Sequence, residues 1–284
     1  MSGQQRVLAI HDISGFGRCS LTVALPVLSA AGIECTVLPT AVLSTHTGGF
    51  TGYTFRDLSA DILPIADHWK SLDLHFDAIY TGYLGSFEQI ALIEAVLEEL
   101  AGPDTLIVVD PVMGDKGKLY AGFPHDFPSG MANLCRRADV IVPNLTEAAL
   151  MLNRPWTEDL AAIDVDNLLH DLSEQLAVAR VVLTGVSQAS GQLGASTYDA
   201  ATDAASWYGS ERIGGMYHGT GDVFSSVLVA GLVTGLSLAA ASRVAVDFTV
   251  RALRRSFDNR TDPRFGVAFE YFLADLPTLL KSAQ

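Results

Sequence analysis

Short apolar runs alternate along the chain with longer segments whose apolar residues recur at helical spacing. Each run is brief and almost entirely apolar, which is typical of parallel strands buried on both faces. The runs are Val7–Ile10, Thr36–Leu38, Ala78–Tyr80, Leu106–Val109, Val140–Val142 and Val181–Leu183. They predict the strands of a mainly parallel sheet.

The segments between the runs predict helices. Phe87–Leu100 places apolar residues on one stripe and glutamates on the other, as a surface helix does. Residues 193–209 are polar and turn-rich and predict an antiparallel edge hairpin, and from 222 onward the pattern is helical. Strands that alternate with helices predict an α/β fold, a three-layer sandwich with a central sheet flanked by helices. We expect residues 1–284 to form a single domain of this kind.

Composition limits the partners. Of 284 residues, 49% are hydrophobic and 18% charged, and the formal net charge is −14. Nucleic acid and anionic membranes are bound by basic surfaces, so neither is an expected partner. An anionic ligand must instead be met by backbone N–H groups or by bound cations.

Cysteine usage and the absence of long apolar stretches suit a cytoplasmic protein. Cys19, Cys35 and Cys135 are scattered and lack CxxC spacing, so no disulfide framework or zinc site is indicated. The N-terminal stretch has no signal-peptide pattern, and no run has the length of a membrane span. We therefore expect a cytoplasmic location.

Ligands of such sheets bind at the carboxyl ends of the strands. Polar residues that follow the apolar runs are accordingly the first candidates for a site. They are His11, Asp12, Thr40–Gly48, Thr81–Tyr83, Asp110, Asn144 and Thr184.

The stretch HGTGD, 218–222, precedes an apolar helical pattern. Gly219 and Gly221 let the backbone approach a ligand and expose N–H groups at the positive end of the helix, which predicts an anion cradle. Asp222 then has two interpretations: a helix N-cap, or a carboxylate that accepts a proton beside the anion. A Walker A motif is absent from the chain, which argues against a P-loop enzyme.

Two further segments carry carboxylates. In VVDPVMGD, 108–115, Asp110 and Asp115 suit a hydrated Mg²⁺, although Asp-Pro also forms turns. In NLTEA, 144–148, Asn144 and Glu147 form a capping-box pattern, and the predicted sheet also brings Glu147 to the edge that holds Asp110.

Other motifs are weaker. SGFGRCS, 14–20, only partly matches the dinucleotide fingerprint because Ser20 stands at its last position. His46 and His218 adjoin glycines in the predicted ligand loops, and the other histidines show no metal-ligand spacing.

Taken together, the motifs resemble the ribokinase superfamily and, within it, the vitamin B6 kinase branch. The superfamily's GxGD is matched by Gly219–Asp222, and the resemblance runs in order from Leu8 to about Ser256. The branch is matched by STHTGG (44–49), TGYLGS (81–86), DPVMGD (110–115) and NLTE (144–147). The resemblance implies a mainly parallel sheet between helices, a homodimer, and ATP and an alcohol on either side of the GxGD loop.

The resemblance also implies residue roles. Asp222 would bind the substrate hydroxymethyl group and remove its proton, while Gly219, Thr220 and Gly221 would stabilise the charge that develops on the transferred phosphoryl group. Mg²⁺ would be the cofactor, held by Asp110 and Glu147, with a monovalent cation as a further candidate. The implied ATP contacts are Asp110, Asn144, Glu147, Thr184, Gly219 and Gly221, and the implied substrate contacts are Asp12, Ser14, Thr47, Gly48, Tyr83 and Asp222.

The chain departs from the branch at Asp12, where pyridoxal kinases usually carry serine. DISGFG, 12–17, is instead similar to a stretch of hydroxymethylpyrimidine kinases. Asp12 could simply cap the turn that follows it. At the ring, an ionised aspartate only accepts hydrogen bonds, so it would favour donors such as the aminomethyl arm of pyridoxamine. The expected activity is ATP-dependent phosphorylation of pyridoxal, pyridoxamine or pyridoxine. The alternatives are a hydroxymethylpyrimidine kinase, a sugar kinase of the same superfamily, and a non-catalytic pyridoxal phosphate binding protein, which would not need a base.

Overall fold

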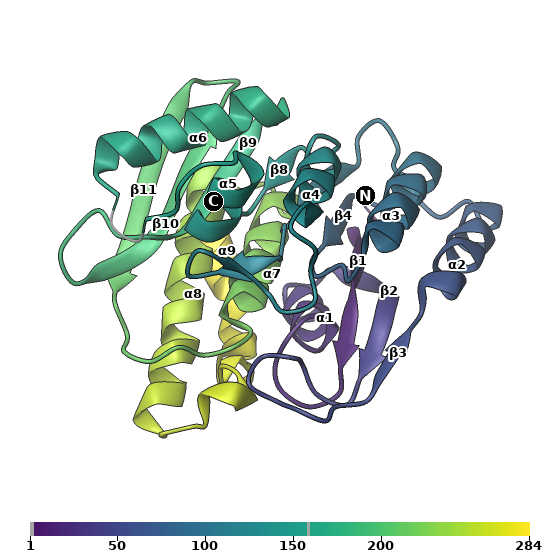
Figure 1. Ribbon diagram of the computed structural model, residues 1–284, viewed down its shortest axis with the longest axis horizontal. Coiled ribbons are helices and arrows are strands. Elements are labelled where there is room, and N and C mark those ends of the chain that lie inside the picture. The colour runs from purple at the N-terminus through teal and green to yellow at the C-terminus, as the bar shows by residue number, and fades with distance from the viewer. Residues whose placement is uncertain (1–2, 158–159) are drawn as a thin grey trace.

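The computed structural model describes residues 3–157 and 160–284, and a nine-stranded sheet forms its centre (Figure 1). The strands of this sheet are β1 (Arg6–Ser14), β2 (Glu34–Leu43), β3 (Phe55–Asp57), β4 (Ala78–Thr81), β5 (Leu106–Val109), β8 (Val140–Ile141), β9 (Arg180–Val186), β10 (Gln192–Asp199) and β11 (Ala204–Glu211). Their order is β11-β10-β9-β8-β5-β4-β1-β2-β3. Strands β1, β2, β4, β5, β8 and β9 pair in parallel, and β3 and the β10–β11 hairpin add antiparallel edges.

The strand predictions are confirmed, and so is the antiparallel hairpin at one edge. The short strand β3 and a small separate hairpin, β6 (Gly114–Asp115) with β7 (Lys118–Leu119), were not predicted. Strand β1 is also longer than its apolar run because its pairing with β2 continues through an irregularity between His11 and Ile13. Polar residues such as Asp12 therefore lie within the strand and not after it.

Helices cover both faces of the sheet, as the predicted sandwich requires. One buried cluster packs helices α2 to α6 on one face, and a second packs α1, α7, α8 and α9 on the other. After residue 258 the chain forms two 3-10 segments before the last helix, where the pattern predicted helix throughout. The elements are α1 (Leu21–Ala30), α2 (Ser59–Ser71), α3 (Phe87–Leu100), α4 (Phe127–Cys135), α5 (Leu145–Met151), α6 (Ala162–Leu176), α7 (Thr220–Val233), α8 (Leu238–Asp258), η1 (Pro263–Phe265), η2 (Phe269–Asp275) and α9 (Leu276–Ser282).

The boundaries of α3 match the predicted helix because local signals define them. Ser86 is its N-cap, and its hydroxyl oxygen accepts a hydrogen bond from the Gln89 amide at 3.1 Å. The Gln89 side chain is buried and donates to the Thr40 carbonyl oxygen at 3.2 Å. Gln89 therefore connects the capped first turn of α3 to β2.

The sheet order fixes where a ligand can bind. From β1 the chain crosses one face through α1 to reach β2, and from β4 it crosses the opposite face through α3 to reach β5. The crossovers therefore diverge between β1 and β4, which opens a crevice at the carboxyl ends of these strands. Asp12 lies in β1, and Tyr83 and Asp110 follow β4 and β5.

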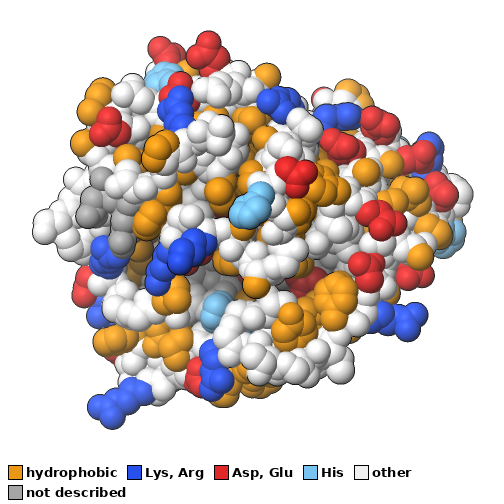
Figure 2. All heavy atoms as spheres, in the orientation of Figure 1, with side chains coloured by type: hydrophobic (Ala, Val, Ile, Leu, Met, Phe, Trp, Pro, Cys, Tyr) orange, Lys and Arg blue, Asp and Glu red, His pale blue; other side chains and the backbone are white. Residues whose placement is uncertain are grey.

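The surface charges and the helix lengths can be compared with the composition. On the face drawn in Figure 2, basic side chains are interspersed with acidic ones and form no continuous patch. Among the described residues, no helix is both long enough and apolar enough to cross a bilayer.

We predict that Ser86→Ala lowers the free energy of unfolding by about 0.5–2 kcal/mol, because the α3 N-terminus loses its capping acceptor. Ser86→Asp keeps an acceptor at the same place and is the matched control. Urea titration monitored by circular dichroism measures both variants. Equal losses in the two variants would contradict the capping role.

Candidate active site

Asp222 lies in the first turn of α7, at the carboxyl edge of the sheet, and it does not cap the helix. The N-cap is Gly219, in the left-handed conformation with a φ of 73°, and no side chain caps this end. The capping interpretation of Asp222 is therefore wrong. The first N–H groups of a helix have no intrahelical partner, so the amides around Asp222 remain available to a ligand.

The two glycines of the motif serve different purposes. A Cβ on Gly219 would lie 1.7 Å from the Arg18 carbonyl oxygen, so this glycine is required by contact with the protein itself. A Cβ on Gly221 would have no neighbour within 4 Å, and this residue is exposed. The predicted close approach of a ligand to the backbone thus fits Gly221 and does not explain Gly219.

Part of the stretch 14–20, which resembled a dinucleotide loop, packs against the GxGD turn. The loop folds back on β1, where Ser20 bridges Ile13 in antiparallel fashion. Ser20 has a φ of 56°, which is rare for a residue other than glycine. Its amide faces the Asp222 carboxylate, and its hydroxyl donates to Asp12 Oδ1 at 2.6 Å.

Asp12 is buried behind this turn. Its second oxygen, Oδ2, accepts a hydrogen bond from the Ser14 hydroxyl at 2.9 Å. Asp12 is 4% exposed and Ser14 1% exposed. Both carboxylate oxygens of Asp12 are thus already engaged by serine hydroxyls, a geometry that favours support of the loop over contact with a ligand ring.

The environment of Asp222 favours its protonated form. Burial raises its pKa from 3.8 to about 6, and the nearby charge of Asp12 acts in the same direction. The Ser20 amide opposes both effects because it stabilises the carboxylate. A pKa near 6 places Asp222 in the range where a carboxylate can act as a general base at neutral pH.

Asp110 and Glu147 meet at the same edge of the sheet. Asp110 follows β5 directly, and burial raises its pKa to about 7, with the charge of Asp222 as a further cause. Burial also raises the pKa of Glu147, and the charge of Asp110 adds to that rise. Asp115, the other carboxylate of its motif, lies instead in the β6–β7 hairpin and is exposed.

Asn144 and Glu147 form the capping box that their spacing predicted. Asn144 Oδ1 accepts from the amides of Thr146 and Glu147, and Glu147 Oε2 accepts from the Asn144 amide at 2.8 Å. Glu147 Oε1 accepts in addition from the Met113 amide at 3.1 Å. The box thus also fixes the loop that follows Asp110.

The two carboxylates suit a magnesium ion that is bound partly by the protein and partly by phosphate oxygens. Among residues 3–157 and 160–284, no group of three or more His, Cys, Asp or Glu side chains could enclose a metal. Two buried carboxylates of raised pKa supply hard oxygen ligands, and Mg²⁺ usually takes one or two carboxylates together with waters and phosphates. Asp110 and Glu147 therefore suit Mg²⁺ that arrives with a phosphate ligand.

The predicted substrate segment is joined to the GxGD turn by two histidines. His46 Nδ1 accepts from the Gly48 amide at 3.1 Å, and Nε2 lies 2.6 Å from the Arg264 carbonyl oxygen, so Nε2 carries the proton. The His218 ring packs against Gly48, where a Cβ would lie 2.3 Å from it. The two rings are 4.8 Å apart. Only their position beside glycines hinted at this arrangement in the sequence.

The remaining predicted residues also lie near these loops. Thr47 is exposed, and Tyr83 is partly buried with its ring 5.7 Å from that of Phe123. Thr184 lies within β9, bridged to Asn144, and its hydroxyl donates to the Pro143 carbonyl oxygen at 3.4 Å. Thr184 thus faces the edge that carries the capping box.

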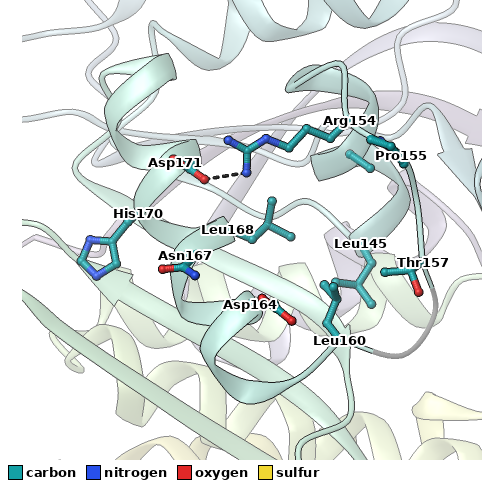
Figure 3. Close-up of a pocket in the computed structure, with 11 residues that line it drawn as sticks. Leu145, Arg154, Pro155, Thr157, Leu160, Asp164, Asn167, Leu168, His170 and Asp171 are labelled. Carbon is teal, nitrogen blue, oxygen red and sulfur yellow. Dashed lines mark hydrogen bonds and ion pairs between the residues drawn. The ribbon is translucent and has the colours of Figure 1, made fainter.

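A separate cavity of about 510 Å³ lies between α5 and α6 (Figure 3). Arg154 crosses part of it to form an ion pair with Asp171 at 2.5 Å, and Leu145 and Leu168 contribute apolar walls. None of the predicted site residues lines this cavity.

The chain is similar to proteins described as phosphomethylpyrimidine kinases and to pyridoxal kinases. Residues 24–263 match the model of the phosphomethylpyrimidine kinase family. A protein from Bacteroides thetaiotaomicron assigned as a phosphomethylpyrimidine kinase, with pyridoxal in its crystal, is 37% identical, with 96% of each chain covered and a TM-score of 0.91. Pyridoxal kinase from Lactobacillus plantarum is 36% identical, with 99% of each chain covered and a TM-score of 0.89.

Curated sequences match over shorter stretches. Pyridoxal kinase PdxY of Vibrio vulnificus is 35% identical over 156 residues, which cover 50% of this chain and 51% of the relative. The matched part of the chain spans about half the length of the first curated relatives.

The raised pKa of Asp222 predicts an effect on stability. The folded state holds this proton up to about pH 6 and the unfolded state only to about pH 4, so the stabilisation is present below pH 4 and lost as pH rises through 6. We expect Asp222→Asn to stabilise the ligand-free protein at about pH 8, by on the order of 2 kcal/mol. The gain should shrink toward about pH 4.

Urea unfolding at both pH values measures this effect, and Asp115→Asn, which removes an exposed carboxylate from the same region, is the control. A loss of stability in Asp222→Asn near pH 8 would contradict the raised pKa of Asp222.

Proposed function

We propose that the chain, which belongs to the phosphomethylpyrimidine kinase family, is an ATP- and Mg²⁺-dependent kinase of vitamin B6 salvage. It transfers the γ-phosphoryl group of ATP to the 5′-hydroxymethyl oxygen of pyridoxal, pyridoxamine or pyridoxine. The observation that carries the proposal is Asp222, a carboxylate with a pKa near 6 that does not cap its helix and adjoins the open backbone of Gly221.

The chemistry follows from the first turn of α7. Asp222 accepts the proton of the substrate hydroxyl as its oxygen bonds to the γ-phosphorus, and the bond from that phosphorus to the leaving oxygen of ADP breaks. The amides of Thr220 and Gly221 have no intrahelical partner and stabilise the charge on the transferred group, while Gly219 shapes the turn.

Other residues hold the two substrates. Asp110 and Glu147 hold Mg²⁺, directly or through water, and the ion offsets the charge of the triphosphate when it is bound. Asn144 and Thr184 contact ATP at the same edge, and Thr47, Gly48 and Tyr83 contact the pyridine ring. The chain as a homodimer, its cytoplasmic location and a monovalent cation as a further ligand are proposals that rest on the family resemblance alone.

Two features favour a B6 vitamer over hydroxymethylpyrimidine, the substrate class in the family's description. The segments STHTGG and TGYLGS resemble pyridoxal kinases, and the similar Bacteroides protein was crystallised with pyridoxal. A hydroxymethylpyrimidine kinase is the alternative, supported by DISGFG at residues 12–17. A non-catalytic pyridoxal phosphate binder is disfavoured because a binder gains nothing from a base such as Asp222.

We expect Asp222→Asn to lower kcat by about 10²–10⁴-fold, because general-base catalysis typically contributes that much. ADP binding measured by calorimetry should stay close to wild type. Turnover of wild type is compared on the three vitamers, hydroxymethylpyrimidine and ribose. A near-normal kcat in Asp222→Asn contradicts the base, and faster turnover of hydroxymethylpyrimidine than of every vitamer contradicts the substrate.

Asp12 is expected to support the site and not to read the ring. Asp12→Ser should lower kcat because it removes the carboxylate whose two oxygens accept from Ser14 and Ser20, while the ranking of vitamers by kcat/KM stays the same. Thr47→Ala, a change at an exposed position of the substrate segment, is the comparison and should alter the ranking. A change in the vitamer ranking in Asp12→Ser would indicate that Asp12 contacts the substrate ring.

A further inference from the structure

Ser225 makes a buried hydrogen bond that joins the helix of the base to the carboxylate after β5. Its hydroxyl donates to Asp110 Oδ2 at 2.7 Å, and the two residues are 1% and 6% exposed. Ser225 follows Asp222 by three positions in α7, so both side chains lie on the same face of the helix. The bond therefore links residues that are 115 positions apart in the chain.

This bond is not the usual one for a serine inside a helix. Such a hydroxyl commonly donates to the carbonyl oxygen one turn earlier. Ser256 does so in α8, where its hydroxyl lies 3.1 Å from the Ala252 carbonyl oxygen. Ser225 donates across the structure to a carboxylate instead, and hydrogen bonds to charged groups are the stronger kind.

The bond leaves one oxygen of Asp110 for another partner. Oδ2 takes the Ser225 hydroxyl, whereas no described residue donates to Oδ1. A carboxylate fixed through one oxygen presents the other in a defined direction, and partners that orient metal ligands in this way strongly affect metal affinity.

We propose that Ser225 is a positioning residue that orients Asp110 toward the Mg²⁺ of the phosphoryl donor and thereby couples the metal ligand to the helix of the base. The inference rests on the proposed function, in which Asp110 is a metal ligand. Ser225 itself touches neither substrate nor metal.

Ser226 provides a matched control because it is the next residue of the same helix. It is fully buried, and its hydroxyl faces the buried Tyr80 hydroxyl and not a carboxylate. Ser226→Ala therefore removes a buried hydroxyl from α7 without removing a bond to a carboxylate. Ser225→Cys is measured beside Ser225→Ala. Its side chain has a similar volume and only a weak donor, so it tests the hydrogen bond without leaving a cavity that could impair folding.

The experiment measures Mn²⁺ affinity by electron paramagnetic resonance in the presence of ADP, for wild type and for each variant. We expect Ser225→Ala and Ser225→Cys to raise the Kd for Mn²⁺ by about 10–100-fold, as the loss of partners to metal ligands typically does. Ser226→Ala should leave it unchanged. In turnover assays, the KM for Mg²⁺ should rise in Ser225→Ala while kcat at saturating Mg²⁺ recovers.

Asp110→Asn separates this inference from the proposed function. If Asp110→Asn weakens Mn²⁺ binding and Ser225→Ala then adds no further loss, the two residues act as one unit and the inference is supported. If Asp110→Asn weakens binding but Ser225→Ala behaves like Ser226→Ala, the positioning role is wrong and the metal assignment stands. If Asp110→Asn has no effect, the metal assignment fails and the inference fails with it.

Discussion

The candidate site depends on four carboxylates that repel one another and lose hydration on burial. Asp12, Asp110, Glu147 and Asp222 converge at the carboxyl edge of the sheet, and burial raises the pKa of each. Ion pairs between described side chains lie among partly exposed groups and involve none of these four carboxylates. Hydroxyl and amide donors hold these carboxylates in place, and a cation brought by a ligand would relieve their repulsion.

The need for hydrogen-bond donors around these carboxylates explains the close backbone contacts of the surrounding loops. Donors must face the carboxylates, so the loop of residues 15–20 folds back under the GxGD turn and Ser20 adopts a backbone conformation that is rare outside glycine. Gly219 leaves no room for a side chain against Arg18, and Gly48 leaves none against His218. The glycines of this site thus bring separate segments together, and only Gly221 has open space beside it.

Several residues serve the fold and the candidate chemistry at once. Asn144 and Glu147 cap α5, yet the same box fixes the loop after Asp110 and leaves Glu147 beside that carboxylate. Capping and metal binding were alternatives in the sequence, and the structure makes them compatible. Asp222 shows the opposite case, because Gly219 is the N-cap of α7 and the Asp222 side chain does not cap the helix.

The strands, their alternation with helices, the α/β class and the motifs that mark the candidate site could all be predicted from the sequence. These features depend on residues close together in the chain, whose periodicity and turn chemistry are local properties. The packed structure was needed to show that Asp12 lies inside a longer β1 and that Asp222 is not a cap. It was also needed to show that His46 contacts Arg264 and that Ser225 donates to Asp110. Those outcomes depend on contacts between distant segments, such as the one from Ser225 to Asp110, and local pattern does not encode such contacts because they arise from the way the layers pack.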